Sequence, residues 1–479
     1  MSDFTCLRHQ RSLSGFFGTF DGLICLSRPL NALRTEMGAR ILNHELSHFF
    51  QNYFTASGLS FFGIVALLNR CLQDFLSESP EVVHSPMMEW LPNSGCLRMD
   101  GHSLSAYDGA ARLLMQLGTA SNSSRVIRNL CLQSDSGATA AAIRHGKLAL
   151  DADSVAVRVG DSFSLPIDYQ AICESMALAQ ELSFAGSYRV RKDHSERRPL
   201  TTAEGSMVPQ AIASCMTGGL LYEVSNLQYT FPLLLLLQSG YNAVESVLLT
   251  TLISFIALCS HFVLPGVTQL GAARPTWFGR TVSRTYVHLL DCALRDRFLD
   301  NLNLLSSPAI AKETTARYLD RFTGQGTVSL FSDSQAALVE VLSALTAESA
   351  SSDWLATYHA RRCNDAVALA HWLQEAPLAE GLATIMNPQE YLIANGAMPV
   401  AFAESEFVNL GALPQTSWEE VMMATLGLHA GRCVLLGRDE FSEALGRTDL
   451  YQKALTARFL VPYGVRVHGW TMAEPPQDL

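Results

Sequence analysis

The stretch His44-Glu45-Leu46-Ser47-His48 decides how this chain is interpreted. It lies within an apolar run that predicts a helix from about Pro29 to Phe54. Residues four apart on a helix lie on the same face, so His44 and His48 present two imidazoles to one divalent metal. Glu45 lies one step round the helix, within reach of a water in an open coordination position. The pattern predicts a hydrolytic metal site with Glu45 as the general base.

The residues around the motif favour a metal over an ordinary core helix. Apolar side chains occupy most sides of the predicted helix, at Ile41, Leu42, Leu46, Phe49 and Phe50. A buried polar group without a partner costs about 1–3 kcal/mol. Two histidines and a glutamate in such a helix therefore need partners, and one metal satisfies all three. The alternative is a buried helix whose histidines form hydrogen bonds within the core.

A third ligand has to come from elsewhere in the chain, and Glu174 is the preferred candidate. It lies in a segment, residues 172–182, that is rich in Ala, Leu, Met and Glu and predicts a second helix, with Asp168 as its N-cap. A strand-like run at Val155–Pro166 leads into it. Glu380 is the rival ligand. Glu181, two turns beyond Glu174 on the same face, and other Asp or His residues are further alternatives.

Two stretches together resemble a known class of enzyme. The run ILNHELSHFFQNYFTASGL at residues 41–59 and the run AICESMALAQEL at residues 171–182 resemble zincin metallopeptidases of the gluzincin type. The likeness is greatest to poorly characterised bacterial HExxH proteins with a Gln shortly after the second His, here Gln51. It covers residues 1–190, and it implies Zn²⁺ held by His44, His48 and Glu174 with Glu45 as general base. The third histidine of metzincins is absent.

The resemblance leaves two parts of such a site to be found. Peptide hydrolysis needs a further donor for the oxyanion, and the candidates that flank the second helix are Tyr169, Tyr188, Arg189 and His194, although each also fits an ordinary surface or packing position. Zincins often place an edge strand beside the metal helix, where an extended substrate pairs by strand addition. In this chain that strand is expected near Leu23–Leu26, with a simple packing strand as the alternative.

The overall pattern predicts an α+β protein that is predominantly helical. We expect a zincin-like lobe with a small sheet at residues 1–190 and a large helical lobe at residues 200–479, with the border in the loop Ser187–Glu204. A run rich in Ser and Gly, Ser121–Gly137, predicts a flexible loop. Other helices are expected at Phe61–Phe75, Thr285–Leu299, Ser334–Ala347, Trp354–Gln374 and Trp418–Leu426.

One uncharged segment, Ser246–Leu264, is just long enough to span a membrane. It carries several hydroxyl side chains, and positively charged flanking residues are missing on both sides. A buried helix pair formed with the leucine-rich run Phe231–Leu237 is the preferred interpretation. We therefore expect no membrane partner.

Composition limits the remaining possibilities. With 479 residues and 48% hydrophobic content the chain can bury a large core, and its net charge of −11 argues against nucleic acid as a partner. The 11 cysteines form no CxxC pair and are odd in number, which is typical of reduced thiols. The N-terminus has no apolar signal-peptide core, so a bacterial cytoplasm is expected. The sequence does not indicate an oligomeric state.

Three functions follow from these patterns. The preferred one is a zinc metallopeptidase that cuts peptide bonds of a specific protein substrate. The alternatives are a non-catalytic protein with a structural metal site and a metal-dependent hydrolase of a small amide or ester. Glu45 favours an enzyme, because a structural zinc is closed by a fourth protein ligand and needs no base.

Overall fold

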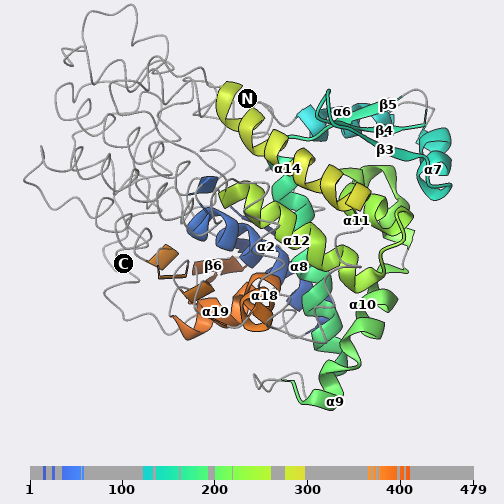
Figure 1. The fold of residues 1–479 in the computed structure, drawn as a ribbon. Coiled ribbons are helices and arrows are strands. Elements are labelled where there is room, and N and C mark those ends of the chain that lie inside the picture. Colours follow the sequence, from blue (N-terminus) through green and yellow to red (C-terminus); the bar gives the residue numbers. More distant parts are fainter. Residues whose placement is uncertain are drawn as a thin grey trace, which may run out of the picture.

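The chain is mostly helical, with two small sheets among the residues that the computed structural model describes, and it is an α+β protein (Figure 1). The described residues are 15–17, 24–26, 35–55, 57–58, 122–132, 136–160, 163–191, 200–217, 219–259, 276–296, 365–366, 368–369, 372–373, 376, 378–395, 400–403 and 406–409. The predicted helices Phe61–Phe75, Ser334–Ala347 and Trp418–Leu426 lie outside them.

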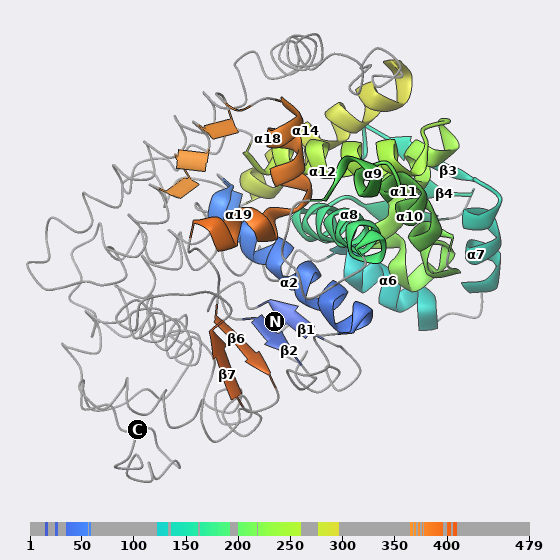
Figure 2. The ribbon, with the colours of Figure 1, turned by 90° about the horizontal axis from the view of Figure 1, so that it is seen from below.

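A four-stranded sheet lies beside helix α2 (Glu36–Phe54) and joins distant parts of the chain (Figure 2). Its order is β1 (Gly15–Phe17), β2 (Ile24–Leu26), β6 (Val400–Ala403) and β7 (Glu406–Asn409). The β1–β2 and β6–β7 pairs are antiparallel, whereas β2 and β6 are parallel. The strand pair β1–β2 that contacts α2 is therefore joined, through β6, to a segment near residue 400.

This sheet corrects the predicted position of the edge strand. The expected strand near Leu23–Leu26 exists as β2, but it pairs on one side with β1 and on the other with β6. Among the described strands, β1 is the edge strand next to α2. The prediction was wrong because β6, almost 400 residues further along the chain, covers the free side of β2.

A second sheet forms one end of the molecule (Figure 1). It is an antiparallel meander of β3 (Leu148–Asp151), β4 (Ala156–Val159) and β5 (Phe163–Pro166), and the predicted strand-like run contains the last two. Helices α6 (Asn122–Leu132) and α7 (Ser136–Arg144) pack against it.

Helix α6 contradicts the flexible loop expected at Ser121–Gly137. Ile127 and Leu130 are buried beneath the helix, so the segment has an apolar face despite its serines. The backbone N–H and the hydroxyl of Ser123 both donate to the carboxylate of Asp168, at 2.9 Å each. A tertiary contact thus anchors a segment whose composition alone is typical of a loop.

Helix α8 (Tyr169–Val190) runs through the middle of the described structure (Figures 1 and 2). Asp168 is its N-cap, as predicted, and accepts a hydrogen bond from the backbone N–H of Ala171 at 2.9 Å. The helix packs against α2, α10 (Val208–Met216), α11 (Leu227–Gln238) and α12 (Ala243–Cys259).

Small residues on α8 allow this close packing. A Cβ on Gly186 would lie only 2.5 Å from Cγ1 of Ile212 on α10, so no larger residue fits there without movement. Ala171, Ala177, Ala179 and Ala185 are also fully buried. Close packing on several sides holds α8 in a fixed position relative to α2.

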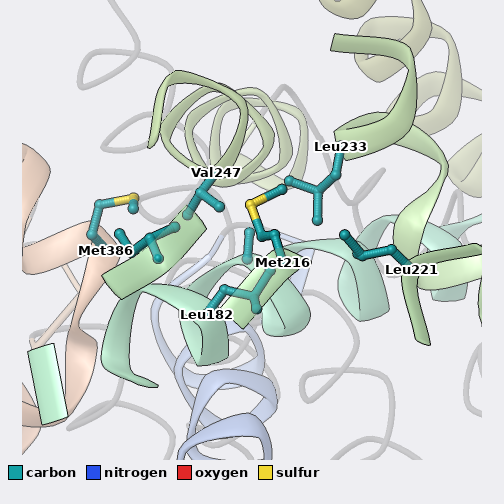
Figure 3. Packing of buried hydrophobic residues seen from close by; sticks show 8 residues of the cluster. Leu182, Met216, Leu221, Leu233, Val247 and Met386 are labelled. Carbon is teal, nitrogen blue, oxygen red and sulfur yellow. The ribbon is translucent and has the colours of Figure 1, made fainter. Parts of the chain in front are cut away.

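The predicted buried helix pair is present as α11 and α12, which contact each other and α8. Figure 3 shows one core cluster in which Leu182 of α8 meets Met216, Leu233 and Val247 from three neighbouring helices. No described helix combines the length and the apolar content that crossing a membrane requires. Helix α8 packs against α2, which precedes the border expected at Ser187–Glu204 in the sequence, and against α10, α11 and α12, which follow it. The division into two lobes stays a prediction.

Helix boundaries differ from the sequence predictions in two places. Helix α2 begins at Glu36 instead of Pro29, because Thr35 has an extended backbone and caps the helix by accepting from the N–H of Gly38. The helix expected at Thr285–Leu299 begins earlier, as α14 (Thr276–Asp296). Of Trp354–Gln374, the described residues 365–366, 368–369 and 372–373 are helical.

The remaining elements are α9 (Thr202–Gly205), η4 (Gly219–Tyr222), η5 (Val224–Asn226), α18 (Leu378–Met386) and α19 (Pro388–Ala394).

Candidate metal centre

Helix α2 presents His44 and His48 side by side, as their spacing predicts. Their rings meet edge to face, with centroids 4.9 Å apart and an interplanar angle of 80°. Both side chains are largely buried, with exposed fractions of 16% and 15%. The exposed remainder means that the pair is not sealed from solvent, as a site that takes a substrate requires.

The facing nitrogens of both rings converge on one carboxylate of α8. Nε2 of His44 lies 3.3 Å from Oε2 of Glu174, and Nε2 of His48 lies 3.2 Å from the same oxygen. Ligand atoms of the three residues all lie within 4.8 Å of one another. Two ligands bound tetrahedrally to zinc at about 2.0–2.1 Å lie about 3.3–3.4 Å apart. The donor set and the two distances to Glu174 are therefore compatible with a zinc ion held by these three residues.

The outward nitrogens of the two rings have different partners. Nδ1 of His44 lies 3.2 Å from Oε2 of Glu181, whose other oxygen accepts from Arg40 at 2.9 Å. Nδ1 of His48 lies 3.1 Å from Oε1 of Gln51. Metal-bound histidines usually donate their second N–H to a carboxylate or a carbonyl oxygen, which fixes the ring. Both histidines have such an acceptor.

The charges of this cluster are strongly coupled. Burial opposes a charge on His44, but hydrogen bonds from its ring to Glu174 and Glu181 outweigh burial and raise its pKa well above the usual value. Burial also opposes a charge on His48, but the charge of Glu174, its hydrogen bond to the ring and the charge of Glu45 together raise the pKa of His48. Burial opposes the charge on Glu174 too, yet the two histidines hold its pKa well below the usual range. Without a metal, each imidazole and Glu174 therefore stabilise the charged form of the other.

Glu45, the candidate general base, lies in the same buried cluster of charges. Its side chain is buried, with 6% of the residue exposed, and it is close enough to both histidines and both α8 glutamates to feel their charges. Burial raises its pKa, although the two histidines act in the opposite direction. A raised pKa makes a carboxylate a stronger base near neutral pH.

The edge strand β1 lies against this carboxylate-bearing residue. A Cβ on Gly15 would lie 3.3 Å from Cγ of Glu45 and 2.9 Å from Cγ2 of Ile41. Only glycine leaves room for the strand to pass at this distance without displacing a side chain. The backbone of β1 is therefore adjacent to the candidate base.

The rival third ligands occupy other positions. Glu380 is exposed on α18 and does not belong to the cluster of His44, His48 and Glu174. Glu181 contacts the far side of the His44 ring instead of sharing the oxygen position of Glu174. The structure thus brings together the three residues that the sequence favoured as ligands.

Two of the oxyanion donors proposed from the sequence, Tyr188 and Arg189, have partners elsewhere. Tyr188 packs on Phe184, with ring centroids 5.8 Å apart, and Arg189 pairs with Glu36 at the first turn of α2. Tyr169 is the first residue of α8, and burial raises its pKa well above the usual value. His194 lies outside the described residues.

Sequence reasoning missed three residues of the site. Arg40 donates to Glu181. It lies one turn before His44 on the same face of α2, and this i, i+4 spacing could have indicated that both residues contact the same acidic side chain. The contacts of Gln51 were not foreseen, although its place after the second histidine was noted. Tyr229 of α11 lies with its ring centroid 6.2 Å from that of His44, and nothing in the sequence around it indicated this.

Comparison of the chain with protein-family models, with curated proteins and with solved structures gives no match.

Proposed function

We propose that this protein is a zinc-dependent peptidase with a zincin-like arrangement of its metal helix and edge strand. The observation that carries the proposal is the convergence of two Nε2 atoms on one carboxylate oxygen, at 3.3 and 3.2 Å, beside a buried glutamate with a raised pKa. His44, His48 and Glu174 are the proposed ligands. This set leaves the fourth position of a tetrahedral ion open, as catalytic zinc sites do.

Zinc bound at this position supplies a water of lowered pKa and a positive charge for the developing oxyanion. Glu45 would accept a proton from that water as its oxygen forms a bond to the carbonyl carbon of the substrate. Glu45 would then give the proton to the amine nitrogen as the C–N bond breaks. Tyr229, beside His44, is the proposed hydroxyl donor to the oxyanion.

A peptide is the preferred substrate because of the strand beside the base. Among the described strands β1 is an edge, and its Gly15 lies against Glu45. An extended peptide that pairs with β1 by strand addition would place one of its carbonyl groups near Glu45. A small amide or ester has no extended backbone to pair with β1, so this edge would not help to bind it.

The test is cleavage of protein substrates by purified, zinc-loaded protein. We would incubate it with a denatured proteome and identify new peptide termini by mass spectrometry. Glu45→Gln should abolish the products while retaining one equivalent of zinc, with a rate loss of about 10²–10⁴-fold. Glu380→Gln is the matched control, because this exposed glutamate was the rival ligand, and it should leave zinc and products unchanged.

Other outcomes would replace the proposal with a named alternative. One equivalent of zinc without any products favours a structural metal site. Products from small amides or esters but not from proteins favour the third function. Absence of zinc from the wild-type chain after loading would leave a metal-free ion-pair cluster and end the peptidase proposal.

A further inference from the structure

We propose that Gln51 is a positioning residue that holds His48 in the one tautomer able to bind a metal, and that the carbonyl of Cys173 sets the orientation of Gln51. The inference rests on the proposed metal site, and it adds a role for two groups that the ligand set does not include. It starts from a chain of contacts that runs from α8 to α2: Cys173 O, Gln51, His48 and Glu174.

The first contact fixes which way the amide of Gln51 faces. Its Nε2 lies 2.9 Å from the backbone oxygen of Cys173. A carbonyl oxygen only accepts hydrogen bonds, so the NH₂ group of the amide has to face it. Gln51 is only 2% exposed, so water does not readily compensate for the opposite orientation. The amide oxygen Oε1 therefore faces His48.

The second contact gives Nδ1 of His48 a hydrogen-bond acceptor. Oε1 of Gln51 lies 3.1 Å from Nδ1 of His48 and cannot donate. In the metal-free chain Nε2 also faces an acceptor, Oε2 of Glu174 at 3.2 Å, so both ring nitrogens compete for hydrogen. A metal at Nε2 would displace the hydrogen there, and the ring would then keep its hydrogen on Nδ1, where Gln51 accepts it.

The same contacts link the two helices at the metal. Cys173 is the residue before Glu174 on α8, and Gln51 lies one turn beyond His48 on α2. One amide therefore joins the turn of α8 that carries a proposed ligand to the turn of α2 that carries another. Nδ1 of His44 instead faces the carboxylate of Glu181. The acceptor at Nδ1 is therefore anionic for His44 and neutral for His48.

A direct test identifies the nitrogen of His48 that binds zinc in the zinc-loaded wild-type chain. Nitrogen-15 NMR of histidine-labelled protein, with His48 assigned from a His48→Gln variant, reports which ring nitrogen carries hydrogen and which binds the metal. We expect zinc on Nε2 and hydrogen on Nδ1. Zinc on Nδ1 would overturn the proposal.

Zinc affinity, measured by competition with a chromophoric chelator, is the second test. Gln51→Met removes the acceptor and should weaken zinc binding about 10–100-fold. Gln51→Glu keeps an acceptor for Nδ1 but cannot donate to Cys173, and it should recover most of that loss. Gln180→Met is the matched control, because Gln180 is equally buried and donates to the carbonyl of Ile385 at 2.6 Å without contacting a histidine.

The outcomes separate this proposal from the peptidase proposal. If the wild type binds zinc and Gln51→Met binds it equally tightly with the same tautomer, Gln51 has no positioning role, although the peptidase proposal stands. If Gln180→Met weakens zinc as much as Gln51→Met, the effect is one of general packing and the proposal fails. A wild-type chain that binds no zinc defeats the proposed function, and the role of Gln51 at the metal with it. The NMR measurement on the wild type needs no variant of Gln51 to fold.

Discussion

Glu181 holds the side of the His44 ring that faces away from Glu174, with its Oε2 3.2 Å from Nδ1. Nε2 on the other side of the ring lies 3.3 Å from Glu174 Oε2. One glutamate of α8 is thus a candidate ligand, and a second, two turns later on the same helix, contacts the opposite side of the candidate ligand His44. Arg40 pairs with Glu181 at 2.7 Å, and this pairing helps to keep the pKa of Glu181 low despite its burial.

Replacing Glu181 should weaken metal binding without removing a ligand. Glu181→Gln keeps the shape of the side chain but loses the charge that faces His44 and Arg40. We expect zinc affinity to fall about 10-fold, as measured by chelator competition. Glu390→Gln is the control, because Glu390 pairs with Arg191 and is 71% exposed. Equal affinities in the two variants would contradict an orienting role for Glu181.

The stabilisation provided by zinc should grow as the pH rises above about 6.5, the usual pKa of histidine. The pKa values of His44 and His48 are raised in the metal-free fold, so their ion pairs with Glu174 stabilise it fully below that pH. This stability is lost as the pH rises through the raised pKa values. Zinc binding strengthens over the same range, because each imidazole has to lose its proton first.

The measurement for this pH effect is the difference in Tm between zinc-loaded and zinc-stripped protein across a pH series. We expect the difference to widen with increasing pH from 6.5 upwards. The His44→Gln variant should show a much smaller dependence. A difference that narrows with increasing pH would contradict the coupling of both histidines to Glu174.

A side chain at Gly15 should disturb the strand beside the base. Gly15→Val would place methyl groups against Ile41, Leu26 and Glu45, where even a Cβ approaches within 2.9–3.3 Å. We expect destabilisation by about 1–3 kcal/mol in denaturant unfolding, as for other overpacked sites. Gly205→Ala is the control, since no atom lies within 4 Å of its Cβ position. Zinc content should stay at one equivalent, and peptide cleavage should fall.

Removing the hydroxyl of Tyr229 should slow cleavage but not metal binding. Tyr229→Phe keeps the ring beside His44 and loses the proposed donor to the oxyanion. We expect kcat to fall about 10²-fold with zinc affinity unchanged. Tyr188→Phe is the control, because that tyrosine packs on Phe184 instead. A Tyr229→Phe enzyme with full kcat would exclude this tyrosine from the chemistry.

Asp168 should contribute to stability through both segments that it joins. It caps α8 at Ala171 and accepts two hydrogen bonds from Ser123 at the start of α6. We expect Asp168→Ala to cost about 2 kcal/mol in denaturant unfolding. Asp153→Ala, at an exposed position, is the surface control and should change the midpoint little. Equal unfolding midpoints for Asp168→Ala and the wild type would mean that water replaces these hydrogen bonds without loss of stability.

Local patterns in the sequence predicted the elements that carry the site. The i, i+4 spacing of His44 and His48 determines that they share a helix face, whatever surrounds the helix. The helix-forming residues after Asp168 predicted α8 and its cap, and the apolar runs predicted α11 and α12 as a buried pair. Each of these features depends on side chains within a few turns of one another.

Only the tertiary structure decided which distant groups meet. Glu174 and Glu380 lay in similar helical segments, and it is the packing of α8 against α2 that brings Glu174, but not Glu380, to the histidines. The pairing of β2 with β6, the contact of Gln51 with Cys173 O and the place of Tyr229 likewise join residues more than 100 positions apart. Helical and strand periodicity specify which face of an element is apolar. They do not specify the partner of that face, because packing energy depends on the complementary shape of segments that no local pattern contains.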